Sequence, residues 1–178
     1  MIILGIDPGT RCTGFGIIQY KNNSFRYISS GVIRPSAKEE IPLRLKKIYS
    51  EITSLISLYH PDQFSIETAF YGQNAQAALK LGQARGVSLL AAVNNGIPVT
   101  EYSPREIKKA VVGNGSSTKE QVLFMIQTIL NLKSQNLILD ESDALAIAVC
   151  HALKINTSTP KSSSWKDFIE QNPDKIIG

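Results

Sequence analysis

Residues 3–18, with the sequence ILGIDPGTRCTGFGII, decide how the first part of this chain folds. An apolar run ends at Asp7, and Pro8 and Gly9 follow it. An ionised carboxylate at the end of a buried strand, beside glycines that let another backbone approach, is placed to hold a metal ion or to face a phosphate. Asp-Pro-Gly is also an ordinary turn between two strands, and taken alone the turn is the better interpretation.

Length and composition favour a single globular domain. The chain has 178 residues, of which 43% are hydrophobic and 19% are charged, as in soluble proteins with a core of their own. The apolar runs are shorter than a membrane span requires. A net charge of +4 favours a polyanionic partner. Cys12 and Cys150 lie far apart without companion metal ligands, which indicates reduced thiols in a cytoplasmic protein.

The hydrophobic pattern predicts strands that alternate with helices. Three strands joined as an antiparallel meander come first, and a turn at residues 21–23 joins the second to the third. Helical spacing then follows between Pro42 and Pro61, and further elements continue to Tyr102. The expected ranges are residues 2–7, 13–20, 25–34, 64–67 and 97–102 for strands and 45–59 and 73–95 for helices.

Two helix starts in the C-terminal half carry the pattern of a capping box, Ser103 with Glu106 and Ser117 with Glu120. A final helix is expected over residues 140–155. We therefore predict an α/β fold with a mixed central sheet flanked by helices, formed by residues 1–155. Residues 156–178 are interpreted as a Ser/Thr/Pro linker and a short tail of unknown role.

Acidic residues stand at comparable places in the predicted elements. Asp7 ends the first strand, Glu67 ends the fourth, and Asp140 and Asp143 open the last helix. Carboxylates at the same end of adjacent strands can converge, and in contact they repel one another unless a cation neutralises them. Oxygen ligands suit Mg²⁺ or Mn²⁺, and a pair of such ions can hydrolyse a phosphodiester. Taken alone, the pair on the helix is slightly better explained by capping and dipole compensation.

Other catalytic arrangements find little support. His60 lies between a helix and a proline, and His151 lies on the last helix, so we interpret both as structural or surface residues. No Cys/His cluster has the spacing of a zinc site, and the sequence contains no Gly-x-Ser-x-Gly elbow or Walker loop.

Four segments of the chain resemble the bacterial RuvC family of Holliday junction resolvases. They are ILGIDPGTRCTGFGII, SIETAFYGQNAQAALKLGQARG, EYSPREIKKAVVGNGSSTKEQV and DESDALAIAVCHA, in the order and spacing of the family. The similarity covers residues 1–155. It implies an RNase H-like fold, a homodimer, and an Mg²⁺-dependent endonuclease that nicks four-way DNA junctions symmetrically. It also implies cooperation with the RuvA and RuvB branch-migration proteins.

The resemblance also implies roles for individual residues. Matched to the family, the catalytic and metal-binding acids are Asp7, Glu67, Asp140 and Asp143, serving two Mg²⁺ ions for which Mn²⁺ can substitute. Lys108 and Lys119 match basic residues near the scissile phosphate, and Lys119 is included in the catalytic set. Phe70 matches an aromatic residue that contacts bases at the junction. Glu141 points elsewhere on its helix, and we interpret it as a surface residue.

Each of these residues has a simpler interpretation. Lys108 could belong to a solvated helix face, and Phe70 could be a core residue, although its polar neighbours favour a loop. A cation such as Lys119 near a helix start opposes the macrodipole, so an anion nearby would compensate it. Two other functions also compete. One is a nucleotide-binding ATPase of the actin and sugar-kinase type, which needs a second lobe, and the other is a metal-free nucleic-acid-binding relative, against which the four acids argue.

Overall fold

The computed structural model describes residues 1–68, 75–132 and 137–157, which contain one mixed five-stranded sheet. Its order is β3-β2-β1-β4-β5. The first three strands pair antiparallel, whereas β4 lies parallel to β1 and β5 parallel to β4. The expected meander is thus confirmed. The bounds are β1 Ile2–Asp7, β2 Thr13–Lys21, β3 Ser24–Ile33, β4 Gln63–Glu67 and β5 Val99–Tyr102.

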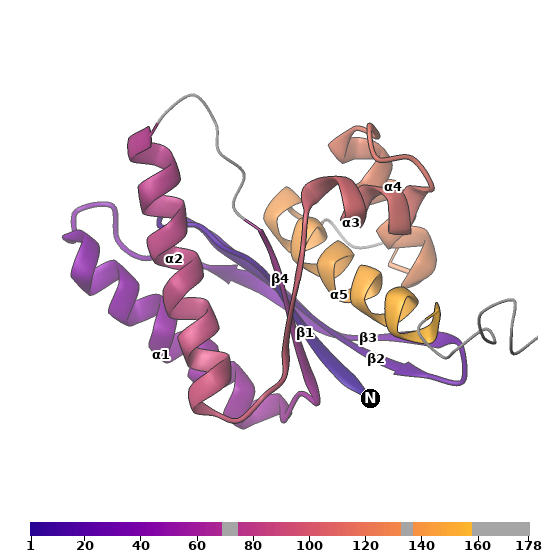
Figure 1. Ribbon diagram of the computed structural model, residues 1–178, viewed down its shortest axis with the longest axis horizontal. Coiled ribbons are helices and arrows are strands. Elements are labelled where there is room, and N and C mark those ends of the chain that lie inside the picture. The colour runs from indigo at the N-terminus through magenta and orange to yellow at the C-terminus, as the bar shows by residue number, and fades with distance from the viewer. Residues whose placement is uncertain (69–74, 133–136, 158–178) are drawn as a thin grey trace, which may run out of the picture.

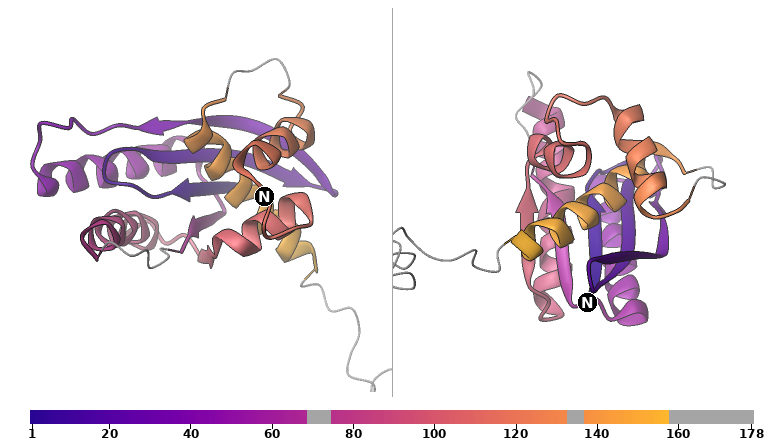
Figure 2. Two further views of the ribbon diagram at one scale, coloured as in Figure 1. Left: turned by 90° about the horizontal axis from the view of Figure 1, so that it is seen from above. Right: turned by 90° about the vertical axis from the view of Figure 1, so that its right-hand side faces the viewer.

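Helices cover both faces of this sheet (Figure 1). One face carries α1 and α2, and the other carries α5 with α3 and α4 packed against it (Figure 2). Two separate hydrophobic clusters fill the two layers, since alternate side chains of a strand point to opposite faces. The bounds are α1 Ile41–Tyr59, α2 Ala75–Asn94, α3 Pro104–Val112, α4 Lys119–Ile129 and α5 Leu139–Thr157.

Helix α5 lies unusually close to the sheet because glycines of β1 and β2 face it. A Cβ atom added to Gly5 would lie 2.3 Å from the carbonyl oxygen of Ala144, and one added to Gly14 would lie 2.1 Å from that of Asp140. Gly16 leaves similar room for the backbone of Leu145. The glycines of the opening motif therefore determine how near the acids of α5 come to Asp7.

Local details of two helices differ from the sequence-based expectation. The Ser103–Glu106 capping box is present, but the second box is formed by Thr118 and Gln121, one residue beyond the expected pair. Ser117 lies in the preceding turn instead, where its hydroxyl donates a hydrogen bond to the carbonyl oxygen of Asn114. The last helix also continues to Thr157, two residues farther than expected.

Two further observations concern the cysteines and the helices. Cys12 and Cys150 are both free thiols, as expected. Among the helices within the described ranges, none is long and apolar enough to cross a membrane.

The close contact between α5 and the sheet can be tested at Gly5. Gly5→Ala forces a methyl group against helix backbone that cannot move aside, and overpacking of this kind costs about 1–3 kcal/mol of unfolding free energy. Ser57→Ala is the control, because Ser57 is an exposed residue of helix α1, away from the contact between α5 and the sheet. Alanine there should be neutral or stabilising by up to about 1 kcal/mol. Urea denaturation at one protein concentration measures both, and equal stability of the two variants would contradict the packing described.

Candidate active site

Three carboxylates meet at the carboxyl ends of the central parallel strands. Asp7 is the last residue of β1 and Glu67 the last of β4, and the two strands are neighbours in register through Ile6 and Ile66. Asp143 reaches the same place from α5. The three acids border a recess of about 180 Å³, the acidic recess, whose other lining residues are Pro104, Ile107, Lys108, Lys119, Val122 and Ala146.

The acidic recess concentrates negative charge. Burial raises the pKa of Asp7 to about 7, and repulsion by Glu67 and then Asp143 adds to that rise. Burial and repulsion by Asp143 likewise raise the pKa of Glu67 to about 7. Full ionisation of all three acids is therefore costly without a cation among them.

Two lysines supply positive charge to the acidic recess. The Lys119 ammonium donates a hydrogen bond to Asp143 Oδ2 at 2.7 Å, and this bond raises the pKa of Lys119. Lys119 is the first residue of α4. The start of a helix carries partial positive charge, so a cation there is unfavourable by itself. The nearby acids compensate both the lysine and the helix dipole. Lys108 comes from α3 and its charge lowers the pKa of Glu67. Both lysines thus line the acidic recess together with the three carboxylates.

Asp140 occupies a neighbouring position outside the lining of the acidic recess. Its Oδ2 atom accepts a hydrogen bond from the Cys12 thiol at 3.1 Å. Its charge still raises the pKa of Asp7, although less than burial and the other acids do. Sequence reasoning grouped four acids and did not connect Cys12 with them. The signal available was the position of Cys12, five residues after Asp7 on the same turn.

The chemistry of the donors fits a divalent cation. Asp7, Glu67 and Asp143 offer only carboxylate oxygens, the ligands preferred by Mg²⁺ and Mn²⁺. As the side chains stand, no three potential ligands among the described residues are grouped closely enough to hold an ion. Lys119 is bonded to Asp143 in this arrangement. A metal ion entering the acidic recess therefore competes with the lysine ammonium for that carboxylate.

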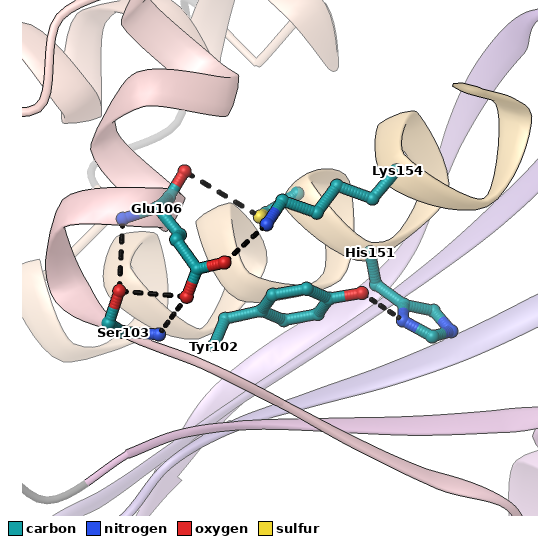
Figure 3. A network of polar contacts seen from close by, with 6 residues as sticks. Tyr102, Ser103, Glu106, His151 and Lys154 are labelled. Carbon is teal, nitrogen blue, oxygen red and sulfur yellow. Dashed lines mark hydrogen bonds and ion pairs between the residues drawn. The ribbon is translucent and has the colours of Figure 1, made fainter. Parts of the chain in front are cut away.

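A polar network fastens α3, the helix that carries Lys108, to α5, the helix that carries Asp143 (Figure 3). Lys154 donates to Glu106 Oε1 at 2.6 Å, and the other oxygen of Glu106 accepts from the backbone and hydroxyl of Ser103. Beneath them the Tyr102 hydroxyl lies 2.9 Å from His151 Nδ1. These contacts keep Lys108 in a fixed relation to the acids.

The two histidines lie outside the acidic recess. Burial lowers the pKa of His151 to about 4, so this residue is neutral within the core. His60 ends α1 in the left-handed conformation, with φ of 46°. The expected structural role of both residues agrees with these positions.

Two other residues of the sequence analysis lie elsewhere. Glu141 Oε2 accepts a hydrogen bond from the backbone of Ile138 at the start of α5. Glu141 does not line the acidic recess. Phe70 lies outside the described residues, as do residues 158–178 of the expected linker and tail.

Comparison with known proteins gives a consistent result. The family model for crossover junction endodeoxyribonuclease RuvC matches residues 3–151. The protein of that name from Chloroherpeton thalassium is 44% identical over 185 residues, covering 99% of this chain and 100% of the relative. Its counterpart from Photobacterium profundum is 52% identical over 151 residues, covering 85% of this chain and 86% of the relative.

Solved structures agree with the sequence comparison. The structure of T. thermophilus RuvC in complex with Holliday junction substrate superimposes with a TM-score of 0.84 at 32% identity, covering 89% of this chain and 97% of that one. The yeast mitochondrial Holliday junction resolvase Ydc2, at 14% identity and a TM-score of 0.59, shares the fold. The fold is thus RNase H-like, as expected.

The raised pKa of Asp7 predicts how the stability of the metal-free protein depends on pH. Between about pH 4 and pH 7 the folded protein retains a proton that the unfolded chain has lost, so stability falls as pH rises through this window. Asp7→Asn removes the free-energy cost of ionising this buried carboxylate in the folded protein. In EDTA at pH 8 this variant should exceed the wild type by about 2–4 kcal/mol in unfolding free energy, and the difference should vanish near pH 4.

Urea denaturation across this pH range measures the effect. Glu51→Gln, which removes an exposed carboxylate of α1, serves as the matched control and should follow the wild-type curve. A constant difference between Asp7→Asn and the wild type at all pH values would contradict the assignment of the penalty to Asp7.

Proposed function

The chain belongs to the RuvC family of crossover junction endodeoxyribonucleases, and we propose that it resolves four-way DNA junctions by hydrolysis at the acidic recess. The observation that carries this proposal is the convergence of Asp7, Glu67 and Asp143 with two lysines in one recess. Acids and lysines together can bind a phosphodiester for hydrolysis, because carboxylates bind metal ions and ammonium groups attract the phosphate oxygens.

We assign the metal to the carboxylates of the acidic recess and to the adjacent Asp140. Two Mg²⁺ ions held there, or Mn²⁺ in their place, would supply the activation of a water molecule and the stabilisation of the leaving oxygen. The water oxygen forms a bond to phosphorus while one ester P–O bond breaks, and the departing oxygen gains a proton. Asp7 and Glu67 approach from the rigid ends of neighbouring strands, so they hold fixed positions. Cys12 orients Asp140 through its thiol hydrogen bond.

The lysines and Phe70 are assigned to the DNA. Lys119 donates a hydrogen bond to Asp143. When a metal ion binds that carboxylate, the lysine ammonium can bind a phosphate oxygen instead. Lys108 also lines the acidic recess, and we assign it to the same phosphate or its neighbour. Phe70 follows Glu67 by three residues, and we assign its ring to contact with unpaired bases, where stacking contributes about 1–3 kcal/mol.

Resolution of a junction requires two nicks related by two-fold symmetry, and we propose that a homodimer supplies them. Helix α2 offers a surface for that contact, since it exposes a stripe of apolar and small residues on one face: Leu79, Gly82, Gly86, Leu90 and Val93. The glycines allow a partner backbone to approach closely. In this proposal the protein acts in the cytoplasm with RuvA and RuvB, residues 1–155 form the nuclease domain, and residues 156–178 form a linker and tail of unassigned role.

A cleavage assay tests the proposed reaction. Labelled synthetic four-way junction should be nicked symmetrically in Mg²⁺ and remain intact in EDTA, while linear duplex of the same sequence remains intact in both. Asp7→Asn should reduce cleavage at least 100-fold and keep junction affinity, because loss of a negative charge does not weaken attraction to phosphates. Glu51→Gln should cleave as the wild type does. Equal cutting of duplex and junction, or ATP hydrolysis without nicking, would contradict the proposal.

The dimer can be tested on α2. Sedimentation of the wild type should give twice the chain mass of 19.5 kDa, whereas Leu90→Glu should sediment as a monomer because its charge would be buried at the contact. Leu58→Glu introduces the same charge at an exposed leucine of α1 and should remain dimeric. The monomeric variant should lose paired nicking of junctions. A wild-type monomer that makes paired nicks would refute the dimer.

A further inference from the structure

A second depression adjoins the acidic recess along α3. It has a volume of about 780 Å³ and runs from the start of α3 to the loop that joins α3 to α4; we call it the α3 groove. Pro104 and Lys108 line both the α3 groove and the acidic recess, so the two depressions adjoin at these residues. The residues that form the walls of the α3 groove are Ser103, Pro104, Arg105, Lys108, Asn114, Gly115 and Ser116.

The α3 groove is basic. Arg105 and Lys108 lie three residues apart on α3 and so share one side of that helix. The described residues that line the groove include no acid. Glu106 stands next to Arg105 in sequence, but Lys154 and Ser103 hold its carboxylate toward α5 (Figure 3). The positive charge therefore comes from two side chains, while the capping box occupies the backbone amides of Ser103 and Glu106.

The loop opposite Arg105 is shaped to accommodate its side chain. A Cβ atom at Gly115 would lie 2.6 Å from Arg105 Cγ, so only glycine lets the arginine lie against the loop. Asn114 Oδ1 accepts hydrogen bonds from the backbone and hydroxyl of Ser116 at 3.1 and 2.9 Å. The buried Ser117 hydroxyl closes the same turn on the carbonyl of Asn114. The groove is thus organised in the absence of a ligand.

We propose that the α3 groove binds a backbone phosphate of the cleaved DNA strand, adjacent to the scissile phosphate, and that Arg105 is its main ligand. This inference rests on the proposed function, because it requires a phosphodiester in the acidic recess. A single strand carries one phosphate per about 3.4 Å of helix axis, so a strand with one phosphate at Lys108 must place the next ones close on either side. The groove continues from Lys108, and Arg105 presents a fork of donors suited to phosphate oxygens.

Removal of single phosphate charges from the DNA tests this assignment. Junctions carry one neutral methylphosphonate at each of three positions on either side of the cleavage site, and binding is measured in EDTA by fluorescence anisotropy over a range of salt concentrations. The wild type should lose several-fold affinity at one flanking position. Arg105→Gln, which keeps the aliphatic stem against Gly115, should bind unmodified junction correspondingly less tightly and show no further loss at that position. The slope of its log binding constant against log salt concentration should be less steep than that of the wild type by about 0.9.

Lys109→Ala is the matched control, since Lys109 is an exposed cation of α3 that does not line the groove. At every methylphosphonate position, this variant should lose the same affinity as the wild type does. Gly115→Val, which pushes the arginine from its place, should reproduce the effect of Arg105→Gln with the charge still present. Equal penalties in wild type and Arg105→Gln at all six positions would overturn the inference while leaving junction cleavage by the wild type intact. Failure of the wild type to cut junctions in Mg²⁺ would instead contradict the proposed function.

Discussion

The close seating of α5 on the glycines of β1 and β2 is the constraint on which the rest of the structure depends. Gly5, Gly14 and Gly16 leave no side chain between the sheet and the helix backbone. The small Ala144 and Ala148 face them and are fully buried. Any larger residue on either surface would lift α5 away from the sheet. Asp143 lies on the same helix, so its distance from Asp7 is determined by this apolar contact.

The electrostatics of the acidic recess oppose this packing. Burial and mutual repulsion raise the pKa values of Asp7 and Glu67 to about 7, which means that the fold holds these groups at the expense of stability. Lys119 offsets part of the repulsion through its bond to Asp143. Sites that bind metal ions commonly combine such destabilised carboxylates with a rigid scaffold, because the binding free energy of the ion then stabilises the folded state.

Helix α3 connects two surfaces that would serve one substrate. Its buried residues Ile107 and Val111 pack on the core, while Lys108 borders the acidic recess and Arg105 the α3 groove. The contacts of Glu106 with Lys154 and Ser103 fix this helix against α5. Because one short helix bears both cations, a DNA strand bound at the α3 groove is also aligned at the acidic recess. The proposed path of the DNA strand is therefore a consequence of how α3 is docked.

The sequence by itself predicted the secondary structure, because alternation, helical spacing and turn residues are local properties of the chain. The family followed from the resemblance of four motifs to it, and that resemblance implied the RNase H-like sheet. The sequence also placed Asp7 and Glu67 at strand ends, where the parallel pairing of β1 with β4 brings them together. The second capping box was predicted one residue too early, because Ser117 is engaged by Asn114 in a turn that local patterns do not reveal. The hydrogen bond of Cys12 to Asp140 and the position of the α3 groove beside the acidic recess were decided only by the tertiary structure. Each depends on the docking of separate elements, and such contacts between distant residues leave no periodic signal in a single sequence.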